Sequence, residues 1–194
     1  MKLFKRIIYV LLGVIILGGA MGAYINTGIG SDPVSIFIEG GSVLTKLKPG
    51  TVSIFMYACF VLVTFFLDKK KIGIGTLIAM VGTKWPLDFV VEHFVAPQSF
   101  LACCAIDVVL CALFGIACAL LVKSNLGASA YDGFTLSIAK TFKFKYTYLR
   151  YVCDALLLLS GWLMGGTIGV GTIIALICSG PFFNFFLKVF KCEK

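Results

Sequence analysis

The sequence IGIGTLIAMVG, residues 72–82, returns almost unchanged as IGVGTIIALIC at residues 168–178. Six of the eleven positions are identical, and four of the other five exchange one apolar side chain for another. Chance is a poor explanation for such a match, so we predict that the chain contains an internal repeat.

The composition indicates a membrane protein. Hydrophobic residues make up 60% of the 194 residues, charged residues only 13%, and the mean hydropathy is +1.03. A soluble domain of this size could not bury that much apolar surface. A membrane-spanning helix needs about 20 mostly apolar residues, and we therefore predict an all-α membrane protein with six transmembrane helices. The predicted spans are residues 7–25, 51–67, 72–91, 99–122, 148–165 and 168–187.

The repeat extends beyond the quoted segments. Gly18 matches Gly115 at nearly the same offset, and IGSDP at 29–33 lies opposite LGASA at 126–130. We predict two three-helix repeats, residues 1–97 and 98–194, which form a single membrane domain. Each repeat carries a short helical segment between its first two spans, and in the first repeat Ser31 or Asp32 would cap a helix that begins at Pro33.

The distribution of positive charge predicts the orientation. Lysines and arginines gather before the first span, between the second and third, around the connection after the fourth, and after the last. Under the positive-inside rule both termini are cytoplasmic. Because three spans are an odd number, the second repeat would be inverted relative to the first. The net charge of +8 is explained by anionic lipid and requires no nucleic acid.

Inverted repeats are typical of secondary transporters, in which two half-structures move around a central site. If the two short linker segments re-enter the membrane, their N-terminal amides could hold an anion or a polar solute. The alternative is a pair of amphipathic helices on the membrane surface, with glycines as turns. The amides in question belong to Gly30, Ser31 and Asp32 in the first repeat and to Gly127, Ala128 and Ser129 in the second.

The motifs GSDPVSIF at 30–37 and GASAYDGF at 127–134, with GIGT and GVGT at the start of the later spans, resemble the YczE/YyaS/YitT family of bacterial membrane proteins. The resemblance covers almost the whole chain. It implies a bacterial plasma-membrane location and no particular chemistry. The second motif departs from the pattern, since Ala130 stands where a proline is expected.

Charged residues inside predicted spans are candidates for function because burying them is costly. Lys84 and Asp88 lie four residues apart on one helical face and can pair, and Pro86 between them is expected to kink the helix. The other repeat keeps a proline at Pro181 without the charge pair. Such a pair could bind a solute or a proton. Alternatively, Lys84 extends to the outer headgroups with Asp88 beside it.

Three further aspartates raise the same question. Asp107 has no local partner, so we predict a proton or cation site there, or a pair with Lys84 across helices. Asp154 follows Arg150 by four residues, which favours a structural ion pair. Asp132 lies in the second linker motif, where helix capping explains it as it explains Asp32.

No sequence motif for catalysis, ATP binding or metal ligation is present, and the eight cysteines are read as small packing residues. We therefore predict a non-enzymatic transporter of a small polar solute that needs no cofactor. Its partners would be the lipid bilayer, the solute and, as an open alternative, further copies of the chain. Two other functions stay open: a substrate-capturing subunit of an energy-coupling-factor importer, and an accessory protein that carries no solute.

Overall fold

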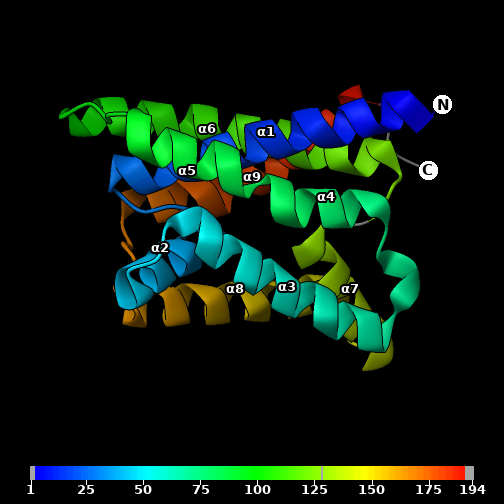
Figure 1. The fold of residues 1–194 in the computed structure, drawn as a ribbon. Coiled ribbons are helices and arrows are strands. Elements are labelled where there is room, and N and C mark those ends of the chain that lie inside the picture. The colour runs from blue at the N-terminus through cyan, green and yellow to red at the C-terminus, as the bar shows by residue number, and fades with distance from the viewer. Residues whose placement is uncertain (1–2, 128, 191–194) are drawn as a thin grey trace.

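The computed structural model describes residues 3–127 and 129–190, which form α-helices and one 3₁₀ turn and contain no strand. Figure 1 shows the helices running roughly along one common direction. The helices are α1 (Leu3–Thr27), α2 (Pro33–Thr45), α3 (Pro49–Leu67), η1 (Lys69–Lys71), α4 (Ile74–Gly82), α5 (Lys84–His93), α6 (Phe100–Ser124), α7 (Ala130–Thr141), α8 (Tyr146–Leu163) and α9 (Val170–Val189).

Five segments of the described chain are long and apolar enough to cross a membrane: α1, α3, α4 with α5, α6 and α9. They agree closely with five of the six predicted spans. The sixth, α8, forms a helix of 18 residues in the expected place but is not among these five. Arg150, Asp154 and several tyrosines make it more polar than the others. The chain is therefore a helical integral membrane protein.

The third predicted span is interrupted in its middle. The regular helix breaks at Thr83, between α4 and α5, three residues before Pro86. A proline has no N–H to donate and its ring disturbs the preceding turn, so the helix cannot continue undisturbed through this point. Helix α9, in contrast, contains Pro181 within one continuous helix.

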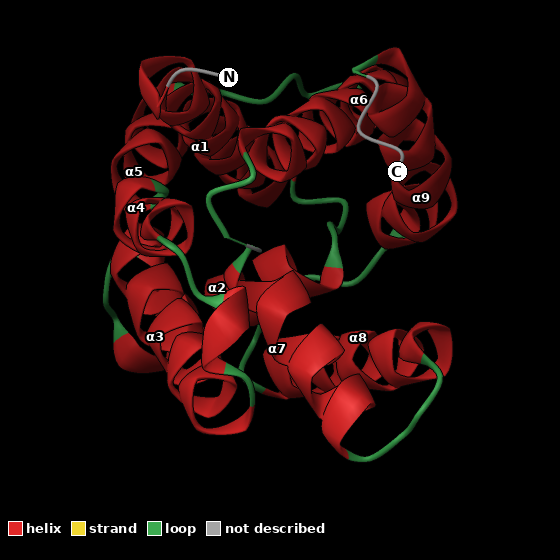
Figure 2. Cartoon of the chain, turned by 90° about the vertical axis from the view of Figure 1, so that its right-hand side faces the viewer, coloured by secondary structure: helices red, strands yellow, loops and turns green. Residues whose placement is uncertain are grey.

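Eight of the helices pack as two groups, one made of α1, α5, α6 and α9 and the other of α2, α3, α7 and α8. Helix α1 packs most extensively on α6, with α5 flanking α1 and α9 flanking α6. On the other side α2 packs against α8, and α3 against α7. Viewed along the helices, α2 and α7 lie between α3 and α8 and face the α1–α6 pair (Figure 2).

Glycines allow the close contacts within the first group. A Cβ at Gly18 would lie 2.6 Å from the carbonyl oxygen of Thr83, and one at Gly22 would lie 2.6 Å from that of Leu87. Helix α1 can therefore approach α5 at backbone distance, which is how small residues promote helix association in membranes.

The repeated GxGT sequences make matching contacts with the loops before α2 and α7. The Gly171 amide donates to the carbonyl oxygen of Ile29 over 2.9 Å, and the Gly75 amide donates to that of Leu126 over 2.9 Å. Gly171 at the start of α9 thus holds the loop before α2, and Gly75 at the start of α4 holds the loop before α7. The following residues, Gly30 and Gly127, have φ values of +99° and +123°, a left-handed region that glycine adopts without strain.

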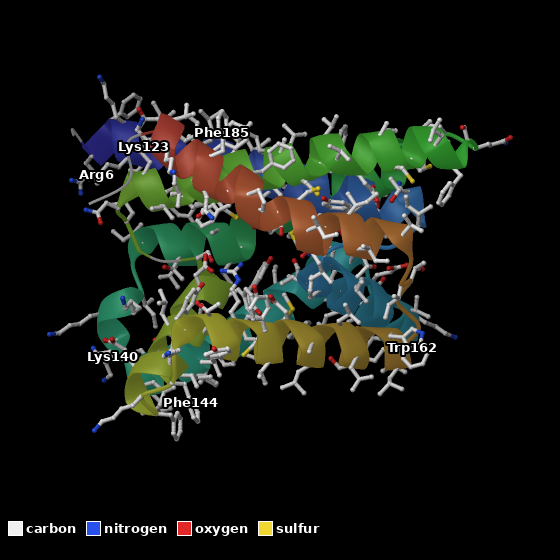
Figure 3. The ribbon with its side chains drawn as sticks, turned by 180° about the vertical axis from the view of Figure 1, so that it is seen from behind. Arg6, Lys123, Lys140, Phe144, Trp162 and Phe185 are labelled. Atoms are coloured by element: carbon white, nitrogen blue, oxygen red, sulfur yellow. The ribbon has the colours of Figure 1, made fainter. Side chains whose placement is uncertain are left out.

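Positive charge gathers at one end of the molecule. Arg6, Lys123 and Lys140 lie at the end where α1 begins and α9 finishes, whereas Trp162 lies at the opposite end (Figures 1 and 3). Between the two ends the flanks expose many large apolar side chains, among them Phe66 and Leu163. A belt of exposed apolar side chains is typical of a protein whose helices lie in a membrane.

Candidate functional site

Helix α2 begins inside the molecule with a complete cap. Asp32 is the N-cap residue, and its Oδ2 accepts from the amides of Val34 and Ser35 at 3.2 and 3.3 Å. Pro33 occupies the first helical position. The predicted start of this helix is confirmed, and the Asp32 carboxylate accepts hydrogen bonds from the first amides of the same helix. Asp32 is 7% exposed, so it is buried beside the helix end.

Helix α7 begins at Ala130 even though no proline precedes or starts it. Ser129 is the N-cap residue and accepts from the amide of Asp132 at 3.2 Å. The Ser129 hydroxyl donates in turn to Asp132 Oδ2 at 2.8 Å. A serine cap with an acidic residue three positions later starts a helix well without proline. Asp132 therefore takes part in capping, as predicted, but as the third residue of the helix and not as the N-cap residue itself.

Arg150 of α8 reaches the start of α7. Its Nη1 lies 2.8 Å from Asp132 Oδ1 and 2.7 Å from the hydroxyl of Tyr146. The predicted pair with Asp154 is also present, at 4.0 Å from Arg150 Nε. Asp154 additionally accepts a hydrogen bond from Tyr131. The closer pair with Asp132 joins two helices and was not predicted from the sequence.

A small cavity of about 50 Å³ lies at this helix start. It is lined by residues of α1 to α4 on one side and of α6 to α8 on the other. Its polar lining comes mainly from Tyr57, Ser129, Tyr131, Asp132 and Arg150. The volume is enough for about one or two water molecules. Among the described residues no group of histidine, cysteine and carboxylate side chains is arranged to hold a metal ion.

Lys84 and Asp88 lie away from this cavity, and they form no ion pair with one another in the described chain. Asp88 Oδ1 instead accepts from the Gly50 amide at 2.6 Å, at the start of α3. Lys84 lines an open groove that also contains Lys48 and Glu92, which pair at 2.6 Å. The prediction of a Lys84–Asp88 pair is wrong because the free amide at the start of α3 takes the carboxylate.

Asp107 is fully buried in α6, and neither carboxylate oxygen has a hydrogen-bond partner among the described residues. It forms no pair with Lys84 there, so that predicted alternative is wrong. Its surroundings are the start of α9 and the loop before α2, since a Cβ at Gly171 would collide with both Asp107 Oδ2 and the Gly30 carbonyl oxygen.

The predicted site residues thus separate into three places. Ser129 and Asp132 line the cavity, and Gly127 lies in the loop just before them. Gly30 and Asp107 meet at α9, with Ser31 and Asp32 in the adjoining loop and cap. Lys84 and Asp88 face the groove. Ala128 lies outside the described residues. Arg150 and Tyr131 were not predicted from the sequence as site residues, because the two come together only when α8 packs against α7. Arg150 was noted in the sequence only as the partner of Asp154.

The long apolar helices define a helical integral membrane protein, and comparison with known proteins gives its family. The chain belongs to the family of unknown function DUF6198, whose model matches residues 4–188. An uncharacterized protein from Haemophilus influenzae is 26% identical over 186 residues, which cover 96% of this chain and 85% of the relative. No solved structure matches the chain.

The uncharacterized protein YyaS of Bacillus subtilis is 25% identical over 194 residues, covering 95% of this chain and 93% of that protein. The resemblance to YyaS is therefore confirmed. The wider grouping with YczE and YitT stays a prediction.

Proposed function

We propose that the protein is a transporter of a small polar solute in the bacterial plasma membrane, built from two inverted repeats. The observation that carries the proposal is the cavity at the start of α7, because both halves line it and it contains the Arg150–Asp132 pair. A polar cavity between two halves of a membrane protein is the usual place for a transported solute.

The inverted arrangement is supported by the matching contacts of the two halves. Helix α1 with α5 corresponds to α6 with α9, and α2 against α8 corresponds to α7 against α3. The bonds from Gly75 to Leu126 and from Gly171 to Ile29 are likewise equivalent. Helices α1 and α6 run in opposite directions in Figure 1, as inversion requires.

The short helices fit a re-entrant arrangement. Each begins inside the molecule and ends towards one end of it, α2 and α7 at opposite ends (Figure 1). Their amide ends therefore face the interior, where the partial positive charge of a helix start favours an anionic or hydrogen-bonding group. At α7 the charge of Arg150 is already paired with Asp132, so a small polar solute with several hydrogen-bonding groups is the best match.

The positive-inside rule supports cytoplasmic termini, because the basic end of the molecule is the end where α1 begins. The small cavity volume represents a closed conformation, in which a solute would enter only after α7 and α8 shift relative to α3.

Topology can be tested with single cysteines at the far ends of the short helices, in a background without native cysteines. Leu44 is 64% exposed at the end of α2, and Phe142 is 60% exposed just after α7. With a membrane-impermeant thiol reagent, Leu44→Cys should react from outside intact cells and Phe142→Cys only in inside-out vesicles. Labelling of both from the same side would exclude the inverted repeat.

Solute binding can be tested by thermal unfolding of the purified protein against a panel of amino acids, organic acids and inorganic anions. A ligand that stabilises the wild type but not Arg150→Gln would locate the site in the cavity. If no ligand stabilises the wild type while the topology holds, the transporter proposal loses its main support.

A further inference from the structure

Asp107 is the most unusual buried polar group in the molecule. It lies in α6 seven residues after Phe100, about 10 Å along the helix from its start at 1.5 Å per residue. Its exposure is 0%, and both carboxylate oxygens lack a hydrogen-bond partner in the described chain. A charged carboxylate is strongly disfavoured in such surroundings, so the group must be neutralised in some way.

The Thr27 hydroxyl at the end of α1 faces Asp107, but it is neutral and donates to the Tyr24 carbonyl oxygen at 2.8 Å, so it brings no compensating positive charge. Asp107 Oδ2 and the carbonyl oxygen of Gly30 each lie 2.3 Å from the place where a Cβ on Gly171 would be, so both oxygens line the same small space beside α9. Both oxygens are hydrogen-bond acceptors, so a proton or a cation in this space would be favourable to both. The Ser31 hydroxyl, which follows directly in the chain, is 1% exposed and is likewise without a partner among the described residues.

The titratable neighbours of Asp107 cannot supply a compensating positive charge. They are Tyr24 of α1 and Cys111 of α6 itself. No lysine, arginine or histidine of the described chain is an electrostatic neighbour of Asp107. The Tyr24 hydroxyl donates to the backbone carbonyl of Asp107 at 3.3 Å and lies 2.9 Å from Cys111 Sγ.

We propose that Asp107 binds an exchangeable proton at this contact, so that its carboxyl O–H donates to the Gly30 carbonyl oxygen. A proton needs only this one donor–acceptor pair, whereas a metal ion needs several converging oxygen ligands. When the loop before α2 moves away from α9, the carboxyl group loses its acceptor, meets water and releases the proton. This coupling role rests on the proposed transport function, but proton binding itself does not.

The site belongs to one half of the molecule alone. At the offset that matches Gly18 with Gly115, Asp107 corresponds to Val10 of α1. Val10 is also fully buried. The other half therefore fills the same place with an apolar side chain, which shows that the fold does not require a carboxyl group there.

The test uses dicyclohexylcarbodiimide, an apolar reagent that adds to protonated carboxyl groups, on the purified full-length protein without any solute. Mass spectrometry should find the label on Asp107, with the labelling rate falling about tenfold per pH unit once the pH exceeds the pKa of the group. Asp107→Asn should lose this label and keep its thermal stability, because an amide mimics the neutral form. Asp32→Asn, the matched control, should retain the label on Asp107.

Three results would overturn the proposal. The first is labelling of other carboxyl groups with none on Asp107 at any pH. The second is labelling that does not change between about pH 5 and 9. The third is protection by millimolar sodium or lithium, which would assign the site to a metal cation. Because no solute takes part, a failed solute screen would remove the transport proposal and leave this result unaffected.

Discussion

Helices α2 and α7 are both short and both begin with a capping side chain, yet their surroundings differ. Helix α2 is locked against α8 by glycines, since a Cβ on Gly40 would collide with the carbonyl oxygen of Gly161. Helix α7 meets α3 through aromatic side chains, with Phe60 and Phe134 stacked at 4.7 Å between ring centroids. The α2 contact is backbone on backbone, and the α7 contact is made by side chains that can change rotamer.

The polar groups follow the same division. At α2 the Asp32 carboxylate satisfies the helix end by itself. At α7 the carboxylate of Asp132 is shared with Arg150 beside a cavity. We expect the α7 side to be where binding occurs and the α2 side to be the stiffer half. The following changes test this difference.

Exchanging residues between the halves should have the largest effect. Gly40 corresponds to Ser137 of α7, at the offset that matches Pro33 with Ala130. Gly40→Ser forces α2 away from α8 and should lower the free energy of unfolding by about 3 kcal/mol or more. Ser137→Gly should cost only about 1 kcal/mol, the penalty of glycine within a helix. Thermal unfolding in detergent measures both, and equal effects would refute the difference in stiffness.

Removing Arg150 should have the next largest effect. Arg150→Ala leaves Asp132 and Asp154 without their ion pair, and we expect a loss of about 2 kcal/mol, less than for a fully buried pair because the side chains are partly exposed. Stabilisation by any bound solute should also disappear. Lys48→Ala, which breaks an exposed ion pair with Glu92, is the matched control and should change neither quantity measurably.

The caps offer a finer comparison. Asp32→Ala and Ser129→Ala should each cost about 1 kcal/mol, because each helix loses its N-cap. Only Ser129→Ala should weaken solute binding, since Ser129 lines the cavity and Asp32 does not. A titration of solute-dependent unfolding temperature separates the two variants. Equal weakening in both would mean that the binding site extends to α2.

The smallest effect concerns the end of α7. Lys140 pairs with Asp68 at 2.8 Å, and this hydrogen bond holds the pKa of the Asp68 carboxyl below its usual range. A lowered pKa adds stability that is present at neutral pH and fades as the pH falls below about 4. Lys140→Ala should therefore lower the unfolding temperature slightly at pH 7 and not in acid. Lys188→Ala, a charge removal without an ion pair in the described chain, should show no such pH dependence.

Much of the fold could be predicted from the sequence because apolar runs and the repeat are local patterns. The start of α2 was predictable for the same reason, since Asp32 and Pro33 are adjacent. The position of Asp88 was not, because its partner is a backbone amide 38 residues away. Arg150 and Asp132 likewise meet only through the packing of α8 on α7. Side chains that pair across helices depend on that packing, which no local pattern encodes.

The hydrogen bond from Gly171 to Ile29 has a consequence for synthesis of the protein. Residue 29 is translated long before residue 171, so the loop before α2 stays without its partner until α9 has been made. Neither half can complete its own loop, and a chain cut between residues 97 and 98 should become stable only when both pieces are made together. The loop before α2 can therefore reach its final structure only after α9 has been made and has packed beside it.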